Sequence, residues 1–178
     1  MVTKKEIDET IIKLKEEFKV YKNSYSNNMN IQRIDVIRLA SIFNFNIYES
    51  NKLPLFVDGI IYSKNKDNYI IINVNLNKED KRYMIVYLLS YYMLHIEDKN
   101  INYHTSNHPI DKLQRDEITE YMAGCLLVPK EELEKLDEYL YNQEFCAKLF
   151  GTTKDLIDLR IKESHFKKKT LLDIFKHK

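Results

Sequence analysis

The longest apolar stretch of the chain covers residues 83–96, where only one serine and one histidine interrupt hydrophobic and aromatic side chains. It is shorter than the roughly 20 residues needed to span a bilayer. It is also too long, and lacks the period of two, for an alternating strand. Asn77 is suited to an N-cap, and Glu79 and Asp80 would favour the positive end of the helix dipole. The pattern therefore predicts a buried central helix over about residues 78–95.

Two amphipathic helices are predicted ahead of this stretch. Apolar residues recur at helical spacing over residues 4–22 and again over residues 33–43. The predicted core positions of the second helix include Ile34, Ile37 and Phe43. Asn44 is typical of the left-handed residue that ends a helix. The polar sequence 23–30 predicts a loop between the two helices.

Strands and further helices follow from the same pattern. Strands are predicted at residues 45–49, 55–62 and 69–74, with a hairpin turn at 63–68. Gly59 indicates a bulge or a close backbone approach. A polar loop is predicted at 98–112, helices at 113–128 and 130–141, and two short helices within 144–163 joined at Gly151. This order of elements predicts an α+β domain. We expect an N-terminal helix and loop (1–30), a core (31–142) and a C-terminal helical extension with a basic tail (143–178).

Composition narrows the class of protein. The chain of 178 residues has a formal net charge of +1, so no overall field favours nucleic acid or an anionic membrane. Cys125 and Cys146 lie in apolar helical patterns and are expected to be reduced core residues. The charged N-terminus lacks the apolar core of a signal peptide, which predicts a cytoplasmic protein without membrane contact.

Three blocks in this order resemble the ImmA/IrrE family of zinc metallopeptidases. They are GIIYSKNKDNYIIINVNL at 59–76, the central helix, and RDEITEYMAGCLLVP at 115–129. The segments DVIRLASIFNFNIYES and CAKLFGTTKDLIDLRIKES extend the resemblance to about residues 33–165. It implies a zincin-like fold, with a small antiparallel or mixed sheet on the central helix and a C-terminal helix-turn-helix-like extension.

The resemblance also locates an active site that this chain lacks. In the family the central helix carries His-Glu-x-x-His, in which two histidines bind zinc and the glutamate activates a water molecule. Tyr87 and Tyr91 align with the histidines, Leu88 with the glutamate and Ile118 with a third ligand, although a one-residue shift would place Glu117 there. Leucine accepts no proton, and a phenol with a pKa of about 10 is a poor zinc ligand. We interpret these positions as a vestigial cleft without catalytic residues, metal or cofactor.

An alternative is a rearranged metal site in an active endopeptidase. His95, His104 and His108, with Glu117 or Glu120, supply suitable ligand types, but no motif pairs them.

The expected function is protein binding, with His95 and Tyr121 as further cleft contacts. Active relatives commonly act on helix-turn-helix repressors of mobile elements or stress responses, so the resemblance implies such a transcription regulator as partner. A DNA-binding role for residues 145–178 is a second alternative, although the predicted helix there mixes basic and acidic residues. Direct contact with nucleic acid is therefore not expected. The sequence leaves the identity of the partner and the oligomeric state open.

Overall fold

The central helix has the predicted bounds. In the computed structural model, α3 spans Lys78–His95, and all seven residues from Met84 to Ser90 are buried. Asn77 caps the helix, because its Oδ1 accepts a hydrogen bond from the backbone N–H of Asp80 at 2.8 Å. A helix that is apolar on every side belongs in the interior of a domain.

The structure describes residues 3–26, 29–64, 67–95, 104–107, 117–136 and 142–163. The other helices are α1 (Lys4–Glu16), α2 (Val36–Ile42), α4 (Glu117–Leu127), α5 (Lys130–Glu134), α6 (Gln143–Phe150) and α7 (Lys154–Glu163). The strands are β1 (Tyr21–Ser26), β2 (Met29–Ile34), β3 (Phe45–Ser50), β4 (Val57–Lys64), β5 (Asp67–Asn73) and β6 (His104–Asn107). The predicted α+β class is confirmed.

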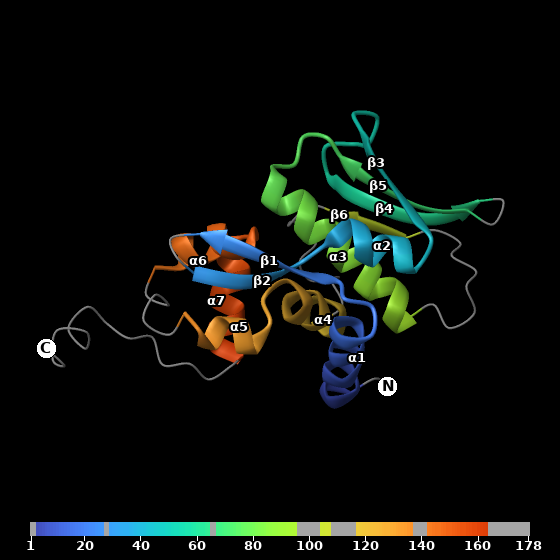
Figure 1. Cartoon of the computed structure of the whole chain (residues 1–178). Coiled ribbons are helices and arrows are strands. Elements are labelled where there is room, and N and C mark those ends of the chain that lie inside the picture. Colours follow the sequence, from blue (N-terminus) through green and yellow to red (C-terminus); the bar gives the residue numbers. More distant parts are fainter. Residues whose placement is uncertain are drawn as a thin grey trace, which may run out of the picture.

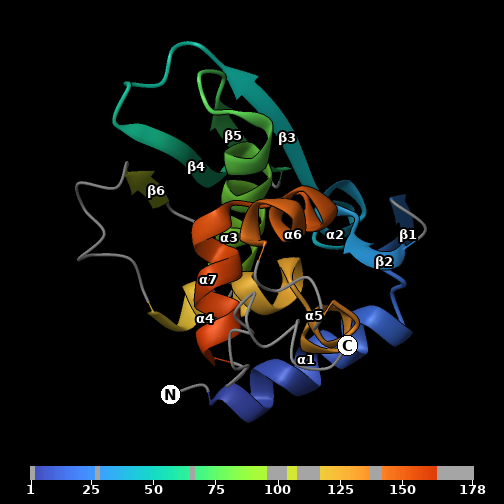
Figure 2. The same cartoon turned by 90° about the vertical axis from the view of Figure 1, so that its left-hand side faces the viewer.

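A four-stranded mixed sheet covers one side of α3. Its order is β3-β5-β4-β6, with β3 parallel to β5 and the other neighbours antiparallel. Figure 1 shows this sheet at one end of the molecule, and Figure 2 shows α3 between it and the helices of the C-terminal half. The predicted polar loop at 98–112 contains strand β6, and the rest of that loop lies outside the described residues.

Gly59 of β4 lets the sheet approach α3 closely, as the sequence predicted. The pairing of β4 with β6 shifts register between Val57 and Gly59. A Cβ atom at Gly59 would lie 3.0 Å from Ile72 Cδ1, 3.0 Å from Met84 Cγ and 3.2 Å from Leu88 Cδ1. These contacts are tight, so a side chain at Gly59 would require Ile72, Met84 and Leu88 to shift.

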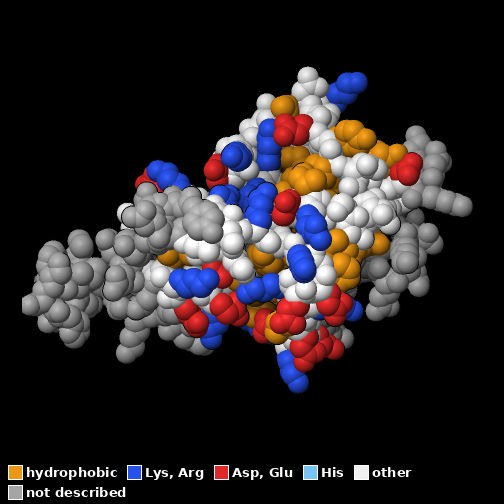
Figure 3. Space-filling view, in the orientation of Figure 1, with side chains coloured by type: hydrophobic (Ala, Val, Ile, Leu, Met, Phe, Trp, Pro, Cys, Tyr) orange, Lys and Arg blue, Asp and Glu red, His pale blue; other side chains and the backbone are white. Residues whose placement is uncertain are grey.

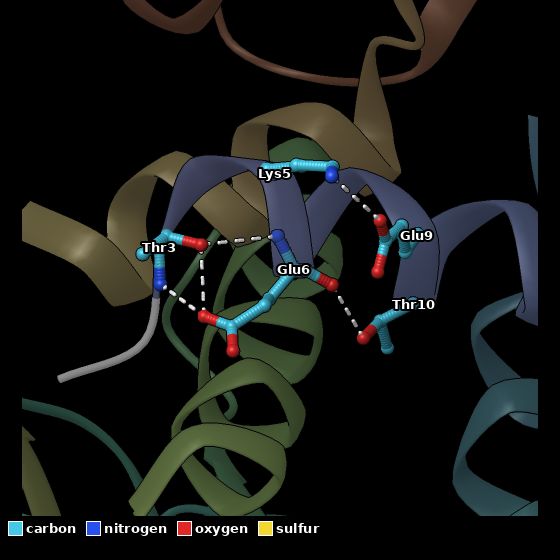
Figure 4. A network of polar contacts seen from close by, with 5 residues as sticks. All are labelled: Thr3, Lys5, Glu6, Glu9 and Thr10. Atoms are coloured by element: carbon cyan, nitrogen blue, oxygen red, sulfur yellow. Dashed lines mark hydrogen bonds and ion pairs between the residues drawn. The ribbon is translucent and has the colours of Figure 1, made fainter.

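Helix α1 is shorter than predicted. Thr3 and Glu6 form a capping box at its start: Thr3 Oγ1 accepts from Glu6 N at 3.3 Å, and Glu6 Oε2 accepts from Thr3 N at 2.7 Å (Figure 4). The helix ends at Glu16 rather than at residue 22. Lys19 adopts a left-handed backbone with φ of 49°, which turns the chain into β1.

The loop predicted at residues 23–30 is wrong. β1 and β2 form an antiparallel hairpin that includes this polar sequence. The hairpin packs on the helical half of the molecule and is separate from the four-stranded sheet. The phenol of Tyr21 donates to Leu126 O at 2.9 Å, and Glu132 Oε2 accepts from Gln32 N at 3.0 Å. These long-range bonds hold polar strands in place.

The second helix also differs from its prediction. It begins after Asp35, whose Oδ1 accepts from the backbone N–H groups of residues 37 and 38, both at 3.2 Å. Ile34 is therefore a buried residue of β2, and Ile37 is 62% exposed and not part of the core. Phe43 packs against the core, and Asn44 has the predicted left-handed backbone with φ of 56°.

The C-terminal helices agree with the predictions within the described residues. α6 ends at Gly151, which has φ of 63°, and α7 follows after a short turn. α4 and α5 cover parts of the helices predicted at 113–128 and 130–141, whose remaining residues are not described, except for a turn at 135–136. Cys125 and Cys146 are buried free thiols, as expected. Among the described helices, none is both long enough and apolar enough to cross a membrane.

Candidate functional site

Four aromatic side chains follow one face of α3. Tyr83, Tyr87, Tyr91 and His95 recur at intervals of four residues, which places them one above the other along the helix. The ring centroids of Tyr83 and Tyr87 are 6.2 Å apart, and those of Tyr91 and His95 are 4.9 Å apart. We call these four residues the aromatic row. The two positions that align with the family's histidine ligands are its central members.

Leu88, the residue predicted to align with the family's general base, is part of the hydrophobic core. Leu88 has no exposed surface, and its Cδ1 atom lies at Gly59 beneath β4. Tyr87 is 3% exposed, whereas Tyr91 is half-buried. Leu88 therefore fills the space between α3 and the sheet, where a carboxylate would lose its hydration.

Helix α4 closes the other side of the aromatic row. Ile118 is half-buried and packs against the core. His95 Nε2 lies 3.2 Å from Thr119 Oγ1, which joins the end of α3 to the start of α4. The sequence prediction included Ile118 and His95 but missed Thr119 and Tyr83. The four-residue spacing of aromatic residues was the signal that could have identified Tyr83.

The residues predicted to align with the family's zinc ligands do not fit a zinc ion. Zinc is bound by thiolate, imidazole or carboxylate groups. The aligned positions supply two phenols, Tyr87 and Tyr91, and two aliphatic side chains, Leu88 and Ile118. Among the described residues, no group of three or more His, Cys, Asp or Glu side chains could hold a metal.

The rearranged metal site stays a prediction. His104 lies in β6 opposite Ile61, and only its backbone is described. His108 lies outside the described residues. Glu117 and Glu120 lie in the first turn of α4. The ring of His95 contacts Tyr91 and Thr119.

Tyr121 lies on a different side of α4 from Thr119. Its ring centroid is 4.3 Å from Lys4 Nζ of α1 and 5.7 Å from Arg160 Cζ of α7. Burial raises the pKa of the neighbouring Cys125 thiol to about 11, although Arg160 and Tyr121 act in the opposite direction. Cys125 therefore remains a protonated thiol at neutral pH, which suits a structural role and not a nucleophilic one.

Helix α7 presents charges of both signs to solvent. Lys154, Asp155 and Lys162 are exposed, and Asp158 and Glu163 are half-buried. Surfaces that bind DNA are usually predominantly basic. The part of the predicted DNA-binding segment beyond residue 163 is not described.

Replacing Leu88 with alanine tests whether this position belongs to the core. We expect Leu88→Ala to lower the free energy of unfolding by about 2–5 kcal/mol, because it removes a fully buried side chain. The volume-conserving control Leu88→Met should cost less than about 1.5 kcal/mol. Urea denaturation of the three proteins measures both values. An unchanged or raised stability in Leu88→Ala would contradict the packing role.

Comparisons with known proteins agree with this architecture. One solved structure of similar fold is a Mycobacterium tuberculosis transcriptional regulator, with a TM-score of 0.51 and 15% sequence identity. The similarity covers 71% of this chain but only 40% of that regulator, so the chain spans less than half of its length. At this identity the likeness concerns the fold alone. A comparison with curated proteins gives no significant match.

A family model provides the more specific result. The model described as the IrrE N-terminal-like domain matches residues 51–162, which include the sheet from β4 onward, α3 and α4. The match covers more than half of the 178 residues. It also contains all four positions at which the family's metal ligands and general base were expected. The chain therefore belongs to the ImmA/IrrE family and has its zincin-like fold.

Proposed function

We propose that this protein is a catalytically inactive member of the ImmA/IrrE family that acts by binding a regulatory protein. The observation that carries the proposal is the occupation of the catalytic positions by the aromatic row and by Leu88. A fully buried leucine replaces the group that must accept a proton. Phenol and aliphatic side chains replace the zinc ligands.

All four of the predicted catalytic positions differ from the family's residues, which supports loss of the peptidase reaction. A single changed ligand could be compensated by a neighbouring side chain. Here none of the four positions carries a usual zinc ligand or a carboxylate base: they are Tyr87, Leu88, Tyr91 and Ile118. The ring of Tyr91 contacts His95. The space that a zinc ion and its water would require is thus lined by groups that favour packing.

Two features support a protein partner. One structure of similar fold is that of a transcriptional regulator. The family resemblance implies helix-turn-helix repressors as partners, because active relatives commonly act on them. In addition, the connection between β3 and β4 exposes two large apolar side chains, Leu55 (79% exposed) and Phe56 (62% exposed). Adjacent exposed apolar residues are typical of protein interaction sites. We propose a helix-turn-helix repressor or a similar regulator as the partner.

Restoring the zinc ligands tests the proposed loss of metal binding. Elemental analysis of the purified native protein should find less than stoichiometric zinc. The combined variant Tyr87→His, Leu88→Glu, Tyr91→His, Ile118→Glu should take up about one zinc per chain, because it restores the family's donor set.

A matched variant that keeps Ile118 controls for the third ligand. It should bind zinc more weakly than the complete variant, because only the two histidine ligands are restored. Stoichiometric zinc in the native protein would contradict the proposal. It would make His95, His104 and His108 the next residues to replace.

Binding without cleavage tests the regulatory role. When the protein is titrated with a helix-turn-helix repressor, the mass of the repressor should stay unchanged. Phe56→Asp should weaken binding by at least about tenfold, because it places a charge in an apolar contact. Asn51→Asp adds the same charge at an exposed position of the same connection and should have little effect. Cleavage of the repressor, or equal affinity of the two variants, would contradict the role.

A further inference from the structure

We propose that Arg33 and Arg82 form a binding site for a phosphate group, at the place where β2, α3 and the turn between α6 and α7 meet. The site is separate from the aromatic row. It lies on the part of α3 nearest its N-terminus and joins the N-terminal hairpin to the C-terminal helices. Figure 3 shows Lys and Arg side chains gathered between the start of α3 and the β1–β2 hairpin.

The guanidinium group of Arg33 has no protein partner in the described part of the chain. It is half-buried, yet it forms neither a hydrogen bond nor an ion pair with any described residue. Its Nη2 atom instead lies directly against Gly151, where a Cβ atom would collide with it. The Nη2 side of the guanidinium is therefore packed on Gly151, and the remaining N–H donors of Arg33 have no partner among the described residues and can bind an oxyanion.

Arg82 adds a second positive charge that is only partly satisfied. One of its terminal nitrogens donates to the backbone oxygen of Ile34, and its Nε is buried without a hydrogen-bond partner among the described residues. The pKa of Arg82 is lowered to about 10, chiefly by burial and then by the charge of Arg33. Because Ile34 follows Arg33 in β2, the hydrogen bond to Ile34 O brings Arg82 to the same part of the strand.

The nearby carboxylates do not neutralise this pair. Asp35 attracts Arg82 and Glu79 attracts Arg33, but neither lies within 4.0 Å of these arginines. Asp35 is engaged elsewhere: one oxygen pairs with Lys22 Nζ at 3.2 Å, and the other caps α2. Uncompensated charge of this kind destabilises a fold and commonly marks a binding site.

The turn before α7 provides further favourable groups. α7 starts immediately after this turn, and Thr153 Oγ1 accepts from Leu156 N at 3.3 Å. The start of α7, where the positive end of the helix dipole lies, follows three residues after Gly151 in the chain. Thr152 is 2% exposed, and its hydroxyl oxygen has no hydrogen-bond partner among the described residues.

The charge of the site selects the class of ligand. Two guanidinium groups match a phosphate monoester, which carries about −1.5 to −2 at neutral pH, whereas a carboxylate would neutralise only one of them. Both free phosphate and the phosphate group of a nucleotide have this chemistry. Because the site joins β2, α3 and the α6–α7 turn, the bound ligand would stabilise the contacts among these segments.

Thermal unfolding of the full chain tests the site. At constant ionic strength, saturating sodium phosphate should raise Tm by about 5–10 °C relative to sodium chloride. Arg33→Gln should abolish the increase. The matched control Arg38→Gln, which removes an exposed arginine bonded to Phe18 O, should retain it. Arg33→Lys keeps the charge but loses the planar guanidinium, which can donate two parallel hydrogen bonds to an oxyanion. It should need at least about tenfold more phosphate for the same increase in Tm.

A parallel titration with adenosine monophosphate identifies the source of the phosphate group. Saturation at lower concentrations than inorganic phosphate would support the site with a nucleotide as ligand, and equal or weaker binding would support it with free phosphate. The proposal is overturned if neither compound raises Tm beyond chloride at equal ionic strength. It is equally overturned if Arg33→Gln responds as the native protein does.

Discussion

The packing of α3 beneath β4 is the constraint on which the rest of the structure depends. The absence of a side chain at Gly59 allows Met84 and Leu88 to lie directly against the strand. This contact determines how closely the helix and the sheet approach each other. Leu88, which is predicted to align with the family's general base, is one of the residues that form this apolar contact.

The proposed loss of the metal centre would account for several features together. A catalytic zinc centre needs polar ligands and a carboxylate beside water, all of which are costly to bury. Leu88 and Tyr87 remove that cost, and the contact between His95 and Thr119 fastens α4 to the end of α3. Arg33 and Arg82, away from the aromatic row, are partly buried cations without an ion pair among the described residues. We interpret the former catalytic region as a rigid core and place the proposed binding functions on other surfaces.

Much of this architecture could be predicted from local sequence signals. Asn77 as a cap, Asn44 as a left-handed residue and Gly59 as a close approach each depend on residues near them in the chain. The β1–β2 hairpin could not be predicted in this way. Its strands are polar, and the groups that bind Tyr21 and Gln32 lie about one hundred residues away along the chain. Ile37 shows that helical spacing alone does not predict burial, because this apolar residue faces solvent.

The most direct test is a crystal structure determined from crystals grown with zinc, with anomalous diffraction measured at the zinc absorption edge. Our account predicts no anomalous peak beside Tyr87, Tyr91 or Ile118, and it predicts Leu88 packed between α3 and β4. A peak there, ligated by the histidines of residues 95–108 or by the glutamates of α4, would contradict the account. It would show that the family's metal chemistry persists with a different set of ligands.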